Sequence, residues 1–278
     1  MKLNYDSKII IGSYAIICAF WVTLVVVSKN SLADNNMLET LQHLTQVPLA
    51  ILPILGGIIG IKNSLGWGGI RSVVGRSSLS LALGLTAWGM GMVFWNYYLF
   101  FANVEIPYPS LADLGYALGL VFFAIGIFSL SRAIGIRYAL RNKKGKILIF
   151  LIPAIVILIS IHLLNNVARG GILVDPSGSY LKLFFDLLYP LGDVVLLTMT
   201  SVLYFISKDF LGGRYKSSIL ILFAGFLVFY VADFGFSYTT TVETYYNGHF
   251  VDFLFATTMF ILSLGLSMLD VKLLSKDK

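Results

Sequence analysis

The dominant pattern along the chain is a series of long apolar runs separated by short polar segments. Each run is about twenty residues long, which is the length that a helix needs to cross about 30 Å of hydrocarbon. We place eight such spans at residues 9–28, 45–61, 79–101, 111–131, 147–166, 183–206, 218–239 and 250–270. The pattern therefore predicts an all-α integral membrane protein, a bundle of about eight transmembrane helices.

The charges follow the alternation of these spans. Hydrophobic residues make up 58% of the 278 residues and charged residues only 12%, with a net charge of +6. Seventeen of the twenty basic residues lie in alternate polar segments, and only Lys29, Arg169 and Lys182 lie in the others. The positive-inside rule then predicts a multi-pass protein of the cell (plasma) membrane with both termini cytoplasmic. Topology explains the positive charge, so we expect no nucleic-acid partner.

The spans group into a single membrane domain, residues 1–278. Residues 1–78 hold two N-terminal spans and a cytoplasmic glycine-rich loop, and residues 79–271 form a six-helix core of three helical hairpins. Within the core, Trp95-Asn96-Tyr97 precedes Asp113 much as Asp233-Phe234-Gly235 precedes Asp252. This similarity suggests a degenerate internal repeat, which would gather the three acid-bearing helices around one centre.

The N-terminal region allows a second interpretation. Lys2 and Lys8, an apolar run and Ser31-Leu32-Ala33 also fit a signal peptide, but residues 9–27 are longer than the usual signal segment, so we expect the span to be retained. The polar segment that follows should be an external loop.

The second span and the segment after it contain helix-weakening residues. Pro48 and Pro53 predict a kink. The glycine-rich segment at 63–78 follows a membrane helix, so we interpret it as a cytoplasmic interfacial loop that Trp67 anchors at the headgroups.

Acidic residues in the outer parts of the later spans are the candidate functional residues. In the order Pro109-Ser110-Leu111-Ala112-Asp113, Ser110 can cap a helix whose third residue is Asp113, which is a purely structural role. Asp193 lies roughly 15 Å inside its span, too deep for a cap, and shares a helical face with Asp186. We expect Asp193 to face the bundle interior beside another polar side chain.

Together with Asp233 and Asp252, these acids place five carboxylates in the outer half of the membrane. Such a set is costly unless it is hydrated, partly protonated or occupied by a cation or a hydrogen-bonding ligand. We therefore predict an outward-facing acidic pocket, with caps and interhelical hydrogen bonds as the structural alternative. The predicted ligand-binding residues are Asp113, Asp186, Asp193, Asp233, Asp252, Asn96, Trp95, Tyr97, Tyr116, Tyr189 and Tyr238.

The sequence identifies no catalytic residue, metal ligand or cofactor. His43, His162 and His249 all fall on the predicted outer side, but no ligand-like spacing joins them. The single cysteine, Cys18, provides neither a disulfide framework nor a thiolate metal site.

Four motifs carry a resemblance to a known family. The segments PYPSLADLGY, YPLGD, VADFGFSY and NGHFVD resemble the multi-span amino-terminal region of many bacterial diguanylate cyclase (GGDEF) and phosphodiesterase (EAL) proteins and of some sensor kinases. The resemblance covers roughly residues 80–270 and implies an input domain that senses a membrane-borne or external signal. Two features depart from it. Asn96 stands where the family often has an acid, and only VKLLSKDK follows the last span, so we expect no output domain.

The function predicted is a prokaryotic membrane-embedded sensing module that binds a small-molecule or lipid ligand. It would signal to a cytoplasmic or membrane partner by helix repacking, through the basic loop at 132–146. Two segments, LGDVVLL and FLVFYVADFGFSY, are also similar to lysoplasmalogenase-type membrane hydrolases. An intramembrane lipid hydrolase that uses buried Asp residues is therefore one alternative. A cation-coupled carrier that uses the same acids is another. Enzymatic activity is thus left open but not favoured, and the ligand and the oligomeric state are not specified.

Overall fold

The computed structural model describes residues 3–30, 32–102, 104, 106–133, 143–168, 170–171, 179–207 and 216–272. Eight helical segments in this part of the chain are long and apolar enough to cross a membrane, which confirms the predicted fold class. The helices are α1 (Tyr5–Lys29), α2 (Asn35–Leu44), α3 (Gln46–Gly66), α4 (Val73–Tyr97), α5 (Leu111–Ala133), α7 (Lys143–Ser160), α8 (Tyr180–Ser207), α9 (Lys216–Thr241) and α10 (Phe250–Ser267). A short 3₁₀ helix, η1 (Gly69–Arg71), precedes α4, and π-helical turns η2 (Tyr98–Ala102) and η3 (Ile161–Ala168) extend α4 and α7.

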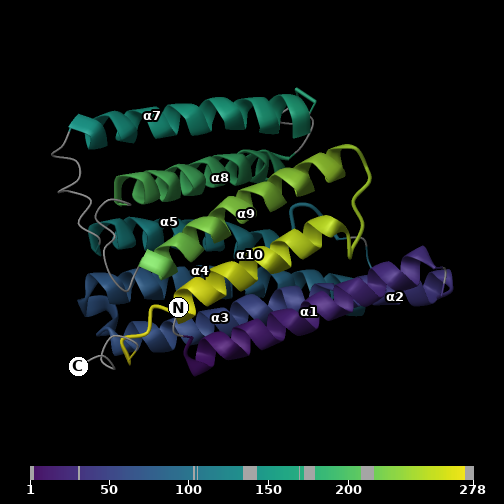
Figure 1. Ribbon diagram of the computed structural model, residues 1–278. Coiled ribbons are helices and arrows are strands. Elements are labelled where there is room, and N and C mark those ends of the chain that lie inside the picture. Colours follow the sequence, from purple (N-terminus) through teal and green to yellow (C-terminus); the bar gives the residue numbers. More distant parts are fainter. Residues whose placement is uncertain are drawn as a thin grey trace.

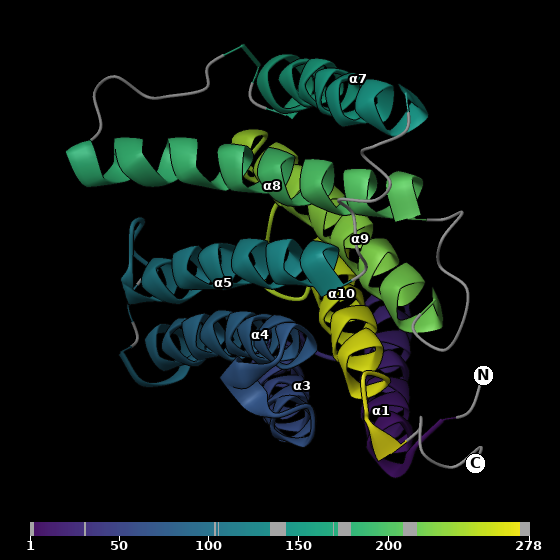
Figure 2. The same ribbon diagram turned by 90° about the vertical axis from the view of Figure 1, so that its left-hand side faces the viewer.

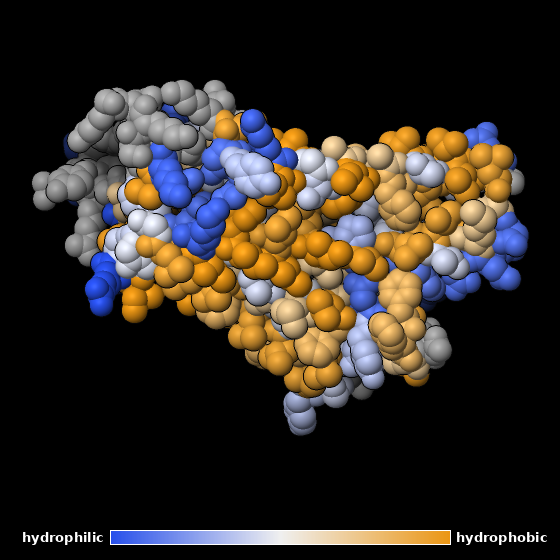
Figure 3. All heavy atoms as spheres, turned by 90° about the horizontal axis from the view of Figure 1, so that it is seen from below, coloured by the Kyte–Doolittle hydropathy of each residue, from blue (hydrophilic) through white to orange (hydrophobic). Residues whose placement is uncertain are grey.

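The surface is that of a membrane protein. Figure 3 shows a broad apolar band between two more polar ends. Large apolar side chains such as Ile16 on α1 (72% exposed) and Phe150 on α7 (78% exposed) point outward. A soluble protein rarely exposes so much contiguous apolar area, so lipid is the natural neighbour of this band.

Both ends of the described chain lie at one face of the bundle. The Asn4 side chain donates a hydrogen bond to the Ser267 carbonyl (3.0 Å), and the Ser7 and Ser267 hydroxyls are 2.8 Å apart. The same end holds an ion pair in which Lys62 Nζ lies 2.8 Å from Asp6 Oδ2. We call this face the inner end and the opposite face the outer end; which of them is cytoplasmic stays a prediction.

The helices differ in how closely they pack. Helix α4 packs extensively against α3 and α5, and α10 packs against α9, α3 and α1. Figures 1 and 2 show α7 as the outermost helix, lying over α8 and away from α3 and α4. The hydrophobic core is correspondingly divided: one large cluster joins most helices, whereas α7 meets α8 through a separate cluster around Ile152, Val156 and Val202.

Glycines explain the close packing of α3, α4 and α5. A Cβ atom added at Gly115 of α5 would lie 2.6 Å from the Cα of Gly91 in α4, and one added at Gly84 would overlap the Phe123 ring. A Cβ added at Gly57 of α3 would overlap Thr86 of α4. Small residues let membrane helices approach to backbone contact, where dispersion attraction is greatest.

One predicted loop is in fact helical. The segment with Asp34, Glu39 and His43 forms α2, because the Asp34 carboxylate caps it by accepting a hydrogen bond from the Met37 amide (2.8 Å). The prediction of a loop there was wrong, since the short polar segment carries its own cap and no helix breaker, while its external position stays a prediction.

The second span and the glycine-rich segment also differ in detail from expectation. Pro53 lies inside α3, which runs without interruption from Gln46 to Gly66, and the kink stays a prediction. Most of the segment 63–78 belongs to the ends of α3 and α4 and to η1, so the interfacial loop is shorter than predicted. Trp67 is anchored by a hydrogen bond from its indole Nε1 to the Leu269 carbonyl (2.7 Å).

The packing of consecutive helices agrees with the predicted hairpins, and the internal repeat stays a prediction. Consecutive helices α4 and α5, α7 and α8, and α9 and α10 do pack together, but α3 also packs against α4 and α10. Of the three acid-bearing helices, α5 packs on α8 while α10 packs mainly on α9 and α3. Most of the predicted signalling loop and several basic residues lie outside the described residues: Lys2, Arg137, Arg141, Arg169, Lys208, Arg214, Lys276 and Lys278.

Candidate functional site

The carboxylate of Asp113 completes the outer start of α5. Its Oδ2 accepts hydrogen bonds from the Ser110 amide (2.6 Å) and hydroxyl (3.1 Å), and the Ser110 Oγ in turn accepts one from the Ala112 amide (3.2 Å). This reciprocal arrangement is a capping box, with Asp in place of the more common Glu. The structural role predicted for Ser110 and Asp113 is confirmed.

Tyrosine hydroxyls tie α8 to α5 at the same end. Tyr189 of α8 donates to Asp113 Oδ1 (2.7 Å), and Tyr108, just before α5, donates to Asp186 Oδ1 of α8 (2.9 Å). Both carboxylates are buried, Asp113 at 6% exposure and Asp186 at 9%. The two hydrogen bonds therefore hold α8 to the start of α5, each with a carboxyl acceptor in a position shielded from water.

Asp252 accepts hydrogen bonds from three different elements of the chain. At the outer start of α10, its Oδ2 accepts from Gln46 Nε2 and the Gly248 amide, both at 2.7 Å, and its Oδ1 accepts from the Tyr245 hydroxyl at 3.0 Å. Burial, together with the Asp252 charge, raises the pKa of Tyr245 well above its usual range. Tyr245 therefore stays a hydrogen-bond donor, and Asp252 holds α10, α3 and the outer loop together.

The starts of α5 and α10 are built alike. In α10 the acid is again the third residue, and the capping side chain is His249, whose Nδ1 accepts from the Val251 amide (3.2 Å). Burial lowers the pKa of His249, which favours the neutral ring that can accept this bond. The sequence similarity between these two regions thus corresponds to a shared local geometry, while the threefold repeat stays a prediction.

Asp193 and Asp233 form a third group, between α8 and α9. Asp193 is 5% exposed, and the two carboxyl groups are hydrogen-bonded to each other. The interior position and the polar partner predicted for Asp193 are confirmed. The nearby Tyr230 of α9 donates to Ser160 Oγ of α7 (2.8 Å).

Residues of α4 and α5 lie between the first two groups. Tyr116 is close enough to interact electrostatically with both Asp113 and Asp252, and its hydroxyl donates to Met92 Sδ (3.0 Å). Asn96 Nδ2 donates to the Met92 and Gln46 carbonyls (2.7 and 3.0 Å), and its buried Oδ1 has no partner among the described residues.

The remaining predicted residues, Trp95, Tyr97 and Tyr238, lie near the outer ends of their helices. Trp95 Nε1 donates to Asn247 Oδ1 in the outer loop (3.2 Å). Tyr97 and Tyr238 are exposed (54% and 42%), and Tyr97 stacks on Phe101. Exposure of this kind is typical of the aromatic belt at a membrane boundary. Their part in ligand binding stays a prediction.

Sequence reasoning missed several residues of these groups. Gln46 is a polar residue directly before an apolar run, which is the signal that identifies it in retrospect. Tyr108, Tyr230, Tyr245 and Ser160 carry no comparable signal, because tyrosine and serine are common near membrane boundaries.

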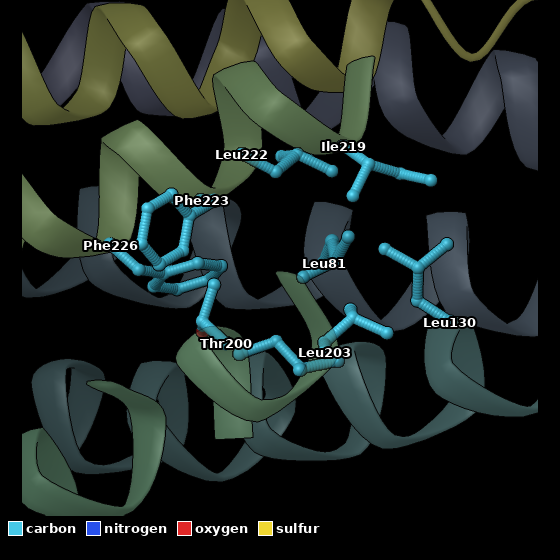
Figure 4. A pocket seen from close by; sticks show the side chains of 9 residues that line it. Leu81, Leu130, Thr200, Leu203, Ile219, Leu222, Phe223 and Phe226 are labelled. Carbon is cyan, nitrogen blue, oxygen red and sulfur yellow. The ribbon is translucent and has the colours of Figure 1, made fainter. Parts of the chain in front are cut away.

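The enclosed cavity drawn in Figure 4 lies elsewhere, among α4, α5, α8 and α9. Its volume is about 10 Å³, room for about one water molecule. It is lined by Leu81, Ile127, Leu130, Thr200, Leu203, Ile219, Leu222, Phe223 and Phe226. No carboxylate contributes to it, so the outward-facing acidic pocket stays a prediction. Within the described ranges, no three His, Cys, Asp or Glu side chains are grouped as metal ligands would be.

The fold and these groups define the class of the protein, an all-helical multi-span membrane protein with buried acidic residues. No family model, curated protein or solved structure matches the chain.

Proposed function

We propose that the chain is a membrane-embedded sensing module in which a ligand acts on the carboxyl pair of Asp193 and Asp233. The observation that carries this proposal is the pair itself, because it joins α8 to α9 at a depth where neither group caps a helix start. A cation or hydrogen-bond donor that engages these carboxyl groups would displace the proton that a hydrogen bond between them requires. The hydrogen bond between the two helices would then be replaced by bonds to the ligand.

The packing around the pair supports a conformational response. Helix α7 contacts α8 through its own small apolar cluster, and little of α7 or α8 is buried. A ligand shifts a conformational equilibrium only by its difference in affinity for the two states. Asp193 lies in this weakly packed layer, so a movement of α8 meets that requirement with little loss of core packing.

The other carboxylates have a different role in this proposal. Asp113 and Asp252 accept hydrogen bonds from their own helix starts and from neighbouring elements. They fix the outer ends of α5 and α10, against which α8 and α9 would move. Movement of α8 would reach a partner at the inner end through the segments around residues 132–146.

Thermal unfolding of the purified protein tests the proposal. Asp193→Asn and Asp233→Asn keep the shape of each side chain but remove its charge. We expect a membrane extract that contains the ligand to raise the unfolding midpoint of the wild type and to have a much smaller effect on either variant, because a ligand that binds only the folded state stabilises it. Asp252→Asn is the matched control and should keep the response. A wild type that no extract shifts would refute ligand sensing at this pair.

The proton that such a hydrogen bond requires also favours a second function, proton-coupled or cation-coupled transport. Buried acids that exchange a proton for a substrate mark the pathways of many carriers. Proton flux in proteoliposomes distinguishes the two functions: a carrier shows flux that Asp193→Asn abolishes, whereas a sensing module shows none.

A further inference from the structure

A buried hydrogen bond joins α9 to α7 beside the carboxyl pair. The Tyr230 hydroxyl of α9 donates to Ser160 Oγ of α7 (2.8 Å), and the two side chains are only 7% and 2% exposed. Tyr230 precedes Asp233 by three residues, so the two are neighbours on one face of α9. Tyr230 is also close enough to Asp193 of α8 for the two to interact electrostatically. One phenol group therefore contacts α7 and lies beside both members of the pair.

Ser160 lies where the helix changes its type and its neighbour. Helix α7 ends at Ser160, and the π-helical segment η3 begins at Ile161. Such π-helical turns are rare and are frequent at functional sites. Helix α7 packs against α8, whereas η3 packs against α9. The acceptor of the Tyr230 hydrogen bond is thus the point at which this segment passes from α8 to α9.

We propose that Tyr230 is a positioning residue that couples the carboxyl pair to α7. This inference rests on the proposed function. A ligand that replaces the hydrogen bond between Asp193 and Asp233 would let α9 move relative to α8, and the Tyr230 hydroxyl would carry that movement to Ser160. The apolar contacts between α7 and α8 cannot do the same, because hydrophobic contacts have no preferred direction, whereas a hydrogen bond fixes both distance and angle.

The test follows the position of α7 by pulsed electron paramagnetic resonance. Spin labels at Ile58 of α3 and Phe150 of α7, both exposed, report the distance between these helices in a protein that carries Cys18→Ala. The double variant Asp193→Asn/Asp233→Asn alters the pair without a ligand, and it should shift this distance. The measured quantity is that shift, compared between backgrounds that differ in the hydrogen bond to Ser160.

Two variants remove the hydrogen bond from opposite sides. Tyr230→Phe keeps the aromatic ring, Ser160→Ala keeps a small side chain, and in each background the shift should vanish. Both changes together should have no more effect than either alone, because they remove the same interaction. Tyr238→Phe removes an exposed hydroxyl from the same helix and should keep the full shift.

The possible failures are distinguishable. A full shift in Tyr230→Phe and in Ser160→Ala would overturn the role of Tyr230 and leave the proposed function intact. A shift that is lost equally in Tyr238→Phe would show a general loosening of α9 and would also overturn it. If the double Asn variant shifts no distance even with the hydrogen bond present, the conformational response of the proposed function is itself contradicted, and the coupling with it.

Discussion

The two sides of the bundle are constructed on different principles. Helices α3, α4, α5 and α10 approach one another through glycines and are joined at their ends by hydrogen bonds, whereas α7 and α8 meet through a small apolar cluster at the edge of the molecule. Asp113 and Asp252 belong to the first region and accept hydrogen bonds from their own helix starts and from neighbouring elements. Asp193 and Asp233 belong to α8 and α9 and contact each other between those two helices. The comparison teaches that the buried carboxylates of one bundle need not serve one purpose.

The largest effect is expected from a bulky residue in the glycine contact. Gly115→Val would force its Cβ into the backbone of Gly91. Overpacking commonly costs about 1–3 kcal/mol, and a backbone contact cannot relax by rotating a side chain, so we expect a loss at or above that upper end. Gly12→Val on α1 is the control, because nothing lies within 4 Å of a Cβ there. Thermal unfolding in detergent measures both, and equal midpoints would show that the two helices are not held by close approach.

The next largest effect concerns Asp252. Asp252→Ala leaves the donors of Gln46, Gly248 and Tyr245 without their acceptor, and each buried orphan costs about 1–3 kcal/mol. Asp252→Asn keeps an oxygen for two of these donors and should cost much less. Chemical or thermal unfolding of the two variants measures the difference. Variants of equal stability would contradict a structural role based on hydrogen bonds.

A smaller effect is expected where α8 is tied to α5. Tyr189→Phe removes the hydroxyl that donates to Asp113 and should cost about 1–2 kcal/mol. Tyr238→Phe, at an exposed hydroxyl, should change stability by less than about 0.5 kcal/mol. If the two variants unfold at the same temperature, the bond between α8 and α5 contributes nothing measurable.

The smallest effect is a pH dependence at the start of α10. Because burial lowers the pKa of His249, the unfolded chain binds this proton more readily than the folded protein. The stability contributed by the neutral ring is therefore present above the ordinary histidine pKa of about 6.5 and is lost as the pH falls below it. His249→Asn retains a capping acceptor but does not titrate in this range. The wild type should lose stability relative to this variant between pH 7 and pH 5; parallel pH profiles would argue against a role for the ring.

The sequence alone was sufficient to predict the membrane spans and the helix cap that Asp113 completes. Apolar runs fix the number of helices because the bilayer sets their length, and the order Ser110 to Asp113 identifies a cap because capping depends on local spacing. Neither the pairing of Asp193 with Asp233 nor that of Gln46 with Asp252 follows from local spacing, since each joins helices distant in sequence. The helix at 35–44 was missed because its apolar content is too low to stand out beside the membrane spans.

The most direct test of the central claim is a measurement of distances between helices by pulsed electron paramagnetic resonance. One pair of spin labels, at Ile58 of α3 and Phe150 of α7, reports on the α7 and α8 side. A second pair, at Ile58 and Leu118 of α5, reports on the glycine-packed side. All three positions are exposed, and Cys18→Ala removes the native thiol so that only the introduced cysteines are labelled. The account predicts a broader distance distribution for the α3–α7 pair, and a shift of that distribution alone when Asp193 and Asp233 are both replaced by Asn. Equally narrow distributions for both pairs, unchanged in the double Asn variant, would contradict it.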